Sequence, residues 1–361
     1  MFYITYENLL EAGYYIGIVK KISAQIKVFE NMFGRVYYTS YTGNMIYLIN
    51  KEKIIEKDFA ITREMCNKII GKWLIKYRVR RTYIRYAFAD KWFIELLKMI
   101  RNNNIRTVIE IPTYPYDGEG INGRRKLEDS YYRMQICNYI ERIATNTDDV
   151  SVWGIPCIRL LNGVNLEDNP LRIKKKEKAR IVLIGVSSLA VWQGYERIMV
   201  GLYNYYKNGG KIEFLFKIIG EGPEENNYRM LVKKNHLEQY VEFCGRLDGE
   251  FLNKQYSLSD LAVSSLGRYK SKIQDITPIK GAEYCARGIP FICGYHDMRF
   301  KGDEPFIMNV TNDSEPIDME KVVEFYKTIT MQQDYQEQMR DYAVKNLSWD
   351  VVMRDIIEYF K

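Results

Sequence analysis

Two acidic residues, Asp275 and Glu283, lie eight positions apart in a segment whose pattern could hold a nucleotide. Residues 275–294 predict a helix that ends at Gly288, because glycine suits the left-handed position after a helix, and then a short buried strand at 291–293. In an α/β sheet, a helix start beside the carboxyl ends of the strands binds phosphates and ribose. A carboxylate there can accept hydrogen bonds from both ribose hydroxyls.

A longer motif runs through the same segment. The pattern P-x-K-x-x-E-Y-x-A-x-G-x-P is present as Pro278, Lys280, Glu283, Tyr284, Ala286, Gly288 and Pro290. It resembles the E-x7-E segment of retaining glycosyltransferases of the GT-B type, in particular the family 4 (group 1) enzymes of bacterial capsular or exopolysaccharide biosynthesis. The resemblance implies that Glu283 binds the donor ribose. Asp275 replaces the usual glutamate and is a catalytic candidate. An ordinary helix–Gly–Pro–strand unit would carry the same residues.

Length and composition favour two domains without a membrane span. A chain of 361 residues with 47% hydrophobic residues exceeds the usual size of one domain and can fill two cores. No apolar run reaches the ~18 residues that cross a bilayer, and the N-terminus lacks a signal-peptide pattern. The six cysteines form no C-x-x-C pair, which indicates reduced core residues of a cytosolic protein. With only His236 and His296, a histidine-based metal site is not expected.

The positive charge belongs to the first half of the chain. Residues 1–160 hold 25 Lys and Arg against 17 Asp and Glu, whereas the remainder holds 28 against 29. Within 68–86, basic residues alternate with aromatic ones, and a peripheral contact with anionic membrane through Trp73 and Tyr77 is one hypothesis. A solvated helix face followed by a strand at 82–86 is the simpler interpretation. Nucleic-acid binding is less favoured, because no known reader motif accompanies the charge.

The first half follows the order of a Rossmann-like domain. Residues 13–33 predict a glycine loop and an amphipathic helix, and a strand follows at 36–38. The resemblance implies that the backbone of Gly17 lies close to the donor phosphate or sugar. A further helix is predicted at 91–100, before the strand at 107–111. A plain turn between strand and helix explains the glycines equally well.

The loop that follows this strand is the candidate acceptor side. Residues 110–119, E-I-P-T-Y-P-Y-D-G-E, resemble a segment of bacterial polysaccharide glycosyltransferases, and a polar loop after a buried strand is a common functional position. Tyr114, Tyr116 and Asp117 are therefore acceptor-side candidates. Glu110 and Glu119 would be the base candidates if the reaction inverted the anomeric configuration. Turn chemistry alone also explains the prolines.

The domain boundary is predicted near residue 165. Asp148-Asp149 is interpreted as a turn with helix N-cap acids, because the larger acidic cluster that a divalent ion prefers is missing. Residues 162–165, N-G-V-N, resemble the N-G-V-D phrase that closes the first domain of these enzymes. We therefore expect an acceptor-side domain at 1–165, a linker at 166–180, a nucleotide-sugar-binding domain at 181–345 and a returning helix at 346–361.

The second domain contributes the candidate donor-binding loops. Ser187 and Gly194 precede a helix start after a strand at 181–186, and Gly220 and Gly222 follow a strand at 214–219. Leu247 belongs to a loop expected to face the donor base. The family often places Arg and Lys where Ser187 and Gln193 stand here. The cations that could replace them are Arg197, Arg268, Lys270, Lys272 and Lys280.

Together these features predict an α/β protein with the GT-B fold, two Rossmann-like domains facing each other across a cleft and a C-terminal helix that crosses back. The resemblance implies a metal-independent, cofactor-free transferase (EC 2.4). It would move a sugar, with retention, from a UDP- or GDP-linked donor to a free or lipid-linked saccharide in surface polysaccharide synthesis. Cytoplasmic location, with contact at the inner face of the membrane, is expected. The alternatives are a GT-B epimerase or phosphorylase, and a catalytically inactive scaffold of a polysaccharide assembly complex.

Overall fold

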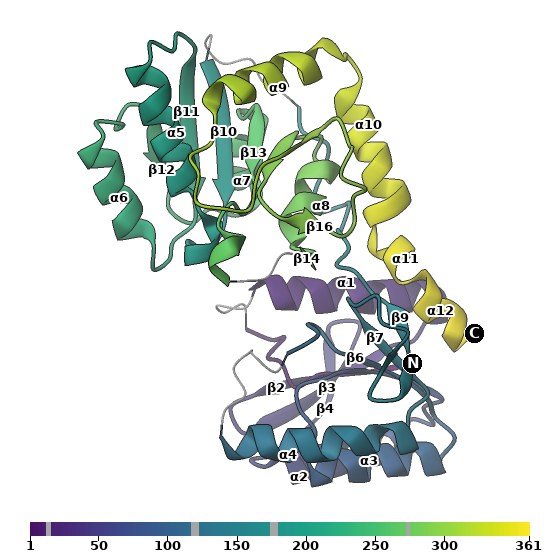
Figure 1. The fold of residues 1–361 in the computed structure, drawn as a ribbon. Coiled ribbons are helices and arrows are strands. Elements are labelled where there is room, and N and C mark those ends of the chain that lie inside the picture. Colours follow the sequence, from purple (N-terminus) through teal and green to yellow (C-terminus); the bar gives the residue numbers. More distant parts are fainter. Residues whose placement is uncertain (12–15, 117–122, 174–179, 272–274) are drawn as a thin grey trace. The chain divides into compact units, whose positions relative to one another are not determined.

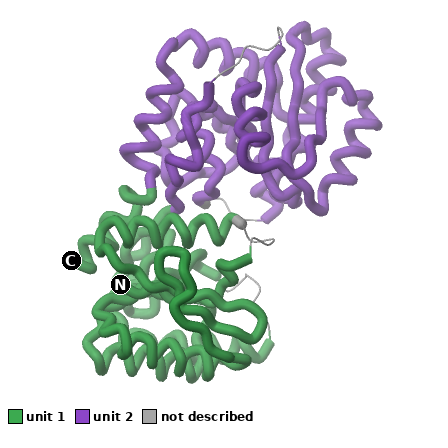
Figure 2. Tube along the Cα trace, turned by 180° about the vertical axis from the view of Figure 1, so that it is seen from behind, with its two compact units in different colours: residues 1–161, 349–361 green, residues 162–348 purple. Residues whose placement is uncertain are grey.

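The computed structural model describes residues 1–11, 16–116, 123–173, 180–271 and 275–361. The chain forms two compact units, which are coloured separately in Figure 2. Unit 1 comprises Met1–Leu161 and Trp349–Lys361, and unit 2 comprises Asn162–Ser348. The C-terminal segment thus returns to the first unit, as the sequence predicted. The segment predicted as a linker begins inside unit 2, where Arg172 is buried.

Unit 1 is built on a largely parallel sheet (Figure 1). Its order in the described residues is β4 (Lys53–Phe59), β3 (Met45–Asn50), β2 (Tyr37–Thr42), β1 (Phe2–Ile4), β5 (Arg81–Arg85), β6 (Arg106–Glu110), β7 (Arg142–Thr145), β9 (Ile155–Arg159) and β8 (Ser151–Val152). The strands from β2 to β9 pair in parallel, and β3, β4 and β8 are antiparallel additions.

Helices cover both faces of this sheet and enclose two cores. The helices are α1 (Ile16–Phe33), α2 (Arg63–Lys76), α3 (Lys91–Asn102), α4 (Arg124–Tyr132), α11 (Trp349–Val352) and α12 (Arg354–Phe360), with a 3-10 turn at Arg133–Asn138. Successive strand residues point to opposite faces. Tyr3 and Tyr83 therefore pack with α1 and the C-terminal helices, whereas Ile4 and Ile84 pack with α2 and α3.

Unit 2 contains a second, wholly parallel sheet. Its order in the described residues is β12 (Val241–Phe243), β11 (Glu213–Ile219), β10 (Arg180–Val186), β13 (Leu261–Val263), β15 (Phe291–Cys293) and β17 (Ile307–Asn309). A separate two-stranded pair joins β14 (Asp275–Ile276) to β16 (His296–Asp297). The carboxyl ends of β10, β11 and β13 lie at one edge, because all three strands run in the same direction.

The helices of unit 2 again divide its core in two. They are α5 (Glu196–Lys207), α6 (Glu225–Lys234), α7 (Gly249–Ser257), α8 (Ile279–Ala286), α9 (Met319–Met331) and α10 (Tyr335–Tyr342), with 3-10 turns at Val191–Gln193 and Arg268–Ser271 and a π-helical turn at Ala343–Leu347. Leu183 and Phe216 pack with α5 and α9, whereas Ile184 and Phe291 pack with α8 and α10. The predicted α/β class and Rossmann-like organisation are confirmed.

Three local predictions differ from the structure. The strand expected at 36–38 is the longer β2, and β3 and β4 extend it into a meander that was not predicted. Asp148 and Asp149 cap no helix; β8 follows them, and Asp148 forms an ion pair with Arg159. The helix in 275–294 begins only at Ile279, so Asp275 lies in a strand and Glu283 in the middle of α8.

The basic and aromatic segment 68–86 is part of α2 and β5. Trp73 is 4% exposed and packs in the core of unit 1, so the prediction that it lies at the lipid headgroups is wrong. Tyr77 is partly buried and donates a hydrogen bond to Glu56. The lysines and arginines at 68, 72, 76, 78 and 80 are exposed. Within the described ranges, no helix combines the length and the apolar character that a membrane crossing needs.

Candidate functional site

The loops at the carboxyl ends of β10 and β11 are joined backbone to backbone. Gly220 has φ +124°, and a Cβ atom on it would lie 1.8 Å from the carbonyl oxygen of Ser187. A Cβ on Gly222 would lie 2.6 Å from the amide nitrogen of Leu189. The amide of Leu189 donates to the carbonyl of Glu221 at 2.9 Å. Only glycine permits this approach, so the predicted donor loops at Ser187 and Gly220–Gly222 form one packed structure.

A second glycine contact joins the segment before α5 to the segment after β13. Gly194 has φ +65°, and a Cβ there would lie 2.4 Å from the amide nitrogen of Gly267. The amide of Leu266 donates to the carbonyl of Gln193 at 2.8 Å. Ser187 belongs to the same edge, and its hydroxyl donates to Tyr195 at 3.2 Å. The structure therefore brings together loops that are more than 70 residues apart in the sequence.

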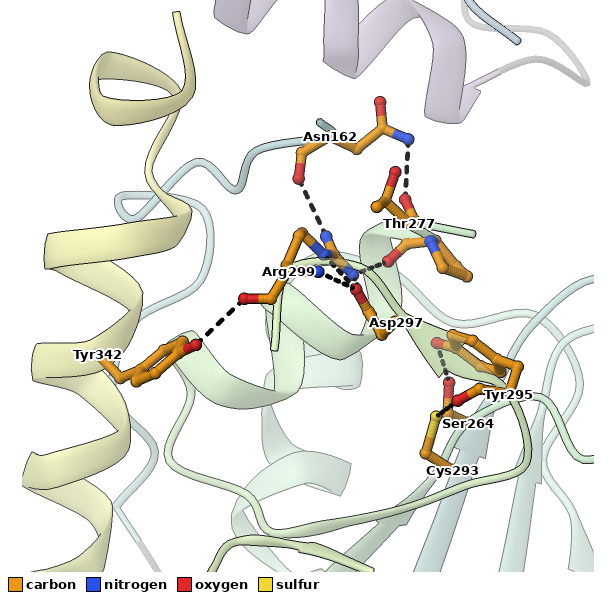
Figure 3. A network of polar contacts seen from close by, with 9 residues as sticks. Asn162, Ser264, Thr277, Cys293, Tyr295, Asp297, Arg299 and Tyr342 are labelled. Carbon is orange, nitrogen blue, oxygen red and sulfur yellow. Dashed lines mark hydrogen bonds and ion pairs between the residues drawn. The ribbon is translucent and has the colours of Figure 1, made fainter. Parts of the chain in front are cut away.

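The start of α8 is held at this edge by Arg299 (Figure 3). Its guanidinium donates to the backbone carbonyls of Pro278 and, at 3.0 Å, of Asn162. An ion pair of 2.6 Å with Asp297 fixes the guanidinium, and Arg299 and Asp297 are both buried. The Asn162 side chain donates to the carbonyl of Thr277 at 2.8 Å. These bonds fix the backbone just before α8 and thus the direction in which its first turn points.

Asp275 and Glu283 occupy different elements. The backbone of Asp275 pairs with His296 between β14 and β16. Glu283 is one helical turn after Lys280 and interacts electrostatically with Lys280 and Arg287. It also contributes, after burial, to the raised pKa of Tyr256. Glu283 thus lies on the helix whose first turn is fixed at this edge of the sheet.

Two of the predicted phosphate-binding cations are committed elsewhere. Arg197 is 2% exposed, and its guanidinium donates to the carbonyls of Glu315, Leu266 and Thr311 and forms an ion pair with Asp313. It therefore ties loops together, and the prediction that it replaces a phosphate-binding cation is wrong. Lys270 forms an ion pair with Glu196 at the start of α5. Lys272 lies outside the described residues.

Lys280 and Arg268 are the two remaining cations of the set, and they lie near each other. Lys280 Nζ donates to Gln193 Oε1 at 2.8 Å, and the same oxygen accepts from Ser265 Oγ at 3.1 Å. Arg268 lies with its guanidinium carbon 5.6 Å from the ring centroid of Trp192. Burial, followed by repulsion from Arg268, lowers the pKa of Lys280 to about 7. Gln193 and Ser265 were not predicted, because nothing in the sequence pairs position 193 with 280.

The loop expected to face the donor base adjoins the glycine loops. The amide of Gly220 donates to the carbonyl of Gly245 at 2.8 Å. Gly245 has φ +65° and leads to Leu247, which is partly buried against the core that includes α8. Gly245 and Leu247 therefore follow β12 at the same edge of the sheet as the glycine loops.

Glu110, a base candidate on unit 1, is an interior residue. It is 1% exposed, and its carboxylate binds Lys21 Nζ at 2.7 Å and Arg85 Nη1 at 3.4 Å. Tyr83 and Gln25 donate to its other oxygen at 2.9 and 3.0 Å. Burial raises its pKa, but the two cations and the hydrogen bonds outweigh burial and hold it below its usual value. This geometry speaks for a structural charge cluster and against a catalytic base.

The remaining first-domain candidates do not converge in the described residues. Tyr116 is buried, and its hydroxyl donates to Asp129 Oδ2 at 2.7 Å. Tyr114 packs against the core, and its amide donates to Asn146. Gly17 is exposed in the first turn of α1, where a Cβ would meet nothing within 4 Å. Asp117 and Glu119 lie outside the described residues. In the part of the chain that the structure describes, no three His, Cys, Asp or Glu side chains form a cluster that could hold a metal ion.

No protein-family model and no curated protein matches the sequence. Solved structures match the fold over the full chain. A glycosyltransferase from Rickettsia africae ESF-5 superposes with a TM-score of 0.71 at 15% identity, covering 100% of this chain and 97% of that one. Anabaena Alr3699/HepE in complex with UDP gives 0.64 at 10% identity, with coverages of 100% and 99%.

A third similar structure is the lipopolysaccharide outer core galactosyltransferase WaaB, in its apo form. It matches with a TM-score of 0.62 at 12% identity, covering 99% of this chain and 98% of that one. At such identities the likeness concerns the fold alone. The chain therefore has the α/β fold of GT-B glycosyltransferases, with two Rossmann-like units.

Proposed function

We propose that this protein is a glycosyltransferase (EC 2.4) that transfers a sugar from a nucleoside diphosphate sugar to a saccharide acceptor. The observation that carries the proposal is the edge of the unit 2 sheet. Closely packed glycine loops, the cations Lys280 and Arg268, and the helix that bears Glu283 meet there. A phosphate group binds well where backbone amides and cations converge at a helix start.

The donor is proposed to be UDP-linked. In this assignment Glu283 accepts hydrogen bonds from the ribose hydroxyls, and the loop from Gly245 to Leu247 lies beside the base. The backbone of Ser187, Gly194, Gly220 and Gly222 surrounds the diphosphate. The Anabaena neighbour was solved with UDP, which supports this choice of base over guanine.

The proposed chemistry is transfer with retention and without a metal. The acceptor oxygen bonds to the anomeric carbon as the bond from that carbon to the diphosphate breaks, and the acceptor proton passes to a leaving phosphate oxygen. Lys280 and Arg268 supply positive charge for the departing diphosphate, as preorganised groups do in other transferases. Glu110 is buried and fully engaged, so it is not available as the base that an inverting reaction would need.

The acceptor is proposed to be a lipid-linked saccharide of surface polysaccharide synthesis. The loop 112–119 would contact it, with Tyr114 and Asp117 as the candidate residues. The exposed lysines and arginines between 68 and 80 support a peripheral contact with anionic lipid at the inner face of the cytoplasmic membrane. The Rickettsia and WaaB structures are transferases, which favours an active enzyme over an inactive scaffold.

Release of nucleotide tests the activity without knowledge of the acceptor. The protein is incubated with UDP-glucose, UDP-galactose, UDP-N-acetylglucosamine and GDP-mannose, and free UDP or GDP is measured. We expect slow hydrolysis of a UDP-sugar, and NMR of the first sugar released should show the anomer of the donor. Glu283→Gln should lower turnover at least about tenfold, because a hydrogen bond to a charged group is lost. Glu324→Gln, on the exposed side of α9, should not.

No nucleotide release from any donor would contradict the proposal, and release of the opposite anomer would contradict retention alone.

A further inference from the structure

The position of the Lys280 ammonium is defined by two neutral side chains. Lys280 is the second residue of α8, and its nitrogen donates to Gln193 Oε1 at 2.8 Å. Ser265 Oγ donates to the same oxygen at 3.1 Å, and Gln193 is 3% exposed. With its oxygen bound to two donors, the carboxamide of Gln193 has a fixed orientation. Three separate segments, before α5, after β13 and in α8, thus contribute to the position of the Lys280 ammonium.

The charges around the Lys280 ammonium leave room for an anion. The cation Arg268 lies on the 3-10 turn beside Lys280 and disfavours its charged form, while Glu283 on α8 favours it. The acceptor that Lys280 contacts is a neutral amide, which does not cancel a full charge. The buried Nε of Arg268 has no hydrogen-bond partner among the described residues. Positive charge therefore gathers on the side of the glycine loops.

The other cations of this edge differ in their bonding. The guanidinium of Arg197 is surrounded by three carbonyl oxygens and a carboxylate, and Lys270 is paired with Glu196. Neither can turn toward a ligand without losing these bonds. Of the candidate cations that the structure describes, Lys280 and Arg268 therefore remain to supply positive charge to the site.

We infer that Gln193 and Ser265 are positioning residues that hold the Lys280 ammonium as the main cation for the diphosphate of the donor. The inference rests on the proposed function and identifies which residues replace the cations missing at positions 187 and 193. Lys280 contacts the diphosphate, and Gln193 and Ser265 act through it. Because Gln193 is a hydrogen-bond partner and not a counter-ion, it fixes the ammonium without neutralising it.

Binding should take up a proton. The pKa of Lys280 is lowered to about 7 by burial and by Arg268, and a diphosphate beside the amine raises it again. Phosphate groups have lost their second proton well below pH 7.5, so above that pH the ligand charge is constant. We expect the dissociation constant of UDP to rise about tenfold between pH 7.5 and 9.

An exchange of the two side chains tests the position of the charge. Isothermal titration with UDP at pH 6.5 compares wild type, Lys280→Gln, Gln193→Lys and the double variant Gln193→Lys/Lys280→Gln. We expect Lys280→Gln to weaken UDP binding at least about tenfold, since a bond to a charged group is lost. The double variant exchanges the partners of one hydrogen bond and should recover binding to within about threefold of wild type. Lys270→Gln is the matched control and should bind as wild type does.

The outcomes separate this inference from the proposed function. Wild type that binds neither UDP nor a UDP-sugar contradicts the proposed function. Wild type that binds UDP while a folded Lys280→Gln binds equally well overturns the role of Lys280. If Lys280→Gln binds UDP weakly and the double variant does not recover the affinity, the positioning role of Gln193 is overturned. If a variant does not fold, proton uptake on UDP binding is measured with wild type instead. The number of protons taken up is obtained from the binding enthalpies in buffers of different ionisation enthalpy. Absence of proton uptake at pH 8 would overturn the inference.

Discussion

Each unit of the molecule places a charge away from bulk water near the carboxyl end of its sheet, buried in unit 1 and partly buried in unit 2, but the two charges have different partners. Glu110 in unit 1 is the last residue of β6, and its carboxylate binds two cations and two neutral donors. Lys280 in unit 2 is the second residue of α8 and binds a neutral carboxamide, with the cation Arg268 and the anion Glu283 nearby. The shifts of pKa show the same contrast. The charged form of Glu110 is favoured by its surroundings, whereas that of Lys280 is disfavoured.

The contrast separates a structural charge from a charge held for a ligand. Burial of a charge is costly unless partners compensate it, so a compensated group stabilises the fold and an uncompensated one costs stability. A cost of this kind is retained at functional sites, where the ligand supplies the missing partner. Glu110 therefore belongs to the scaffold of unit 1, and Lys280 to the donor site that we propose for unit 2.

Removal of the Glu110 charge should give the largest loss of stability. Glu110→Gln leaves Lys21 and Arg85 buried beside a neutral group, which costs about 3 to 5 kcal/mol of unfolding free energy. Urea unfolding measures this change. Glu141→Gln is the control in the same unit, because its ion pair with Arg101 is on the surface and should contribute less than about 1 kcal/mol. Equal effects of the two substitutions would contradict the structural role of Glu110.

A Cβ atom in the donor loop should cost less but still be clearly measurable. Gly220→Ala introduces a Cβ at 1.8 Å from the carbonyl of Ser187, at φ +124°. We expect a loss of about 2 to 4 kcal/mol in unfolding free energy and weaker UDP binding. Gly17→Ala is the matched control, since its Cβ lies in open space in a helix, and it should be neutral or stabilise by about 0.5 to 1 kcal/mol. If Gly220→Ala unfolds with the same free energy as wild type, the two loops are not packed together.

The Lys280 charge should show the smallest effect on stability, and one of opposite sign. Lys280→Met should raise the unfolding free energy by about 1 kcal/mol at pH 6, because burial and Arg268 disfavour the charged form of Lys280 more than Glu283 favours it. The folded pKa of about 7 lies below the ordinary 10.5, so between these values the unfolded chain binds more protons and wild-type stability rises with pH. The advantage of the variant should therefore shrink from pH 7 to 10.5. Urea unfolding at pH 6, 8 and 9.5 measures it, and a pH-independent difference would contradict the low pKa.

The regular elements of the fold could be predicted because local patterns determine them. The stop of α8 follows from Gly288, whose φ is +66°, and the apolar residues Phe291–Cys293 form the buried β15. The meander of β3 and β4 escaped prediction, since every β4 residue except Glu56 is exposed and no apolar face marks the strand. The start of α8 at Ile279 lies between Asp275 and Glu283, but the pairing of Asp275 with His296 was not predicted, because it joins residues 21 positions apart.

The candidate site could be predicted only as far as its loops. The glycines at 194, 220 and 222 mark close backbone approaches, which a sequence can indicate. The sequence does not say which cation faces the loops. Arg197 was one of five candidates, but the fold surrounds it with carbonyls of residues 69 to 118 positions away. Gln193 looked like a missing charge, although in the structure it holds Lys280 at a separation of 87 residues.

The most direct test of the account is a calorimetric titration of UDP into wild type and Glu283→Gln at pH 6.5. The account predicts saturable binding of one UDP per chain to wild type, weakened at least about tenfold in Glu283→Gln, because the ribose hydroxyls lose a charged acceptor. Circular dichroism should show that both proteins are folded at the temperature of the titration. Absence of UDP binding to wild type, or equal affinity of the two proteins, would contradict a nucleotide site at the carboxyl edge of the unit 2 sheet.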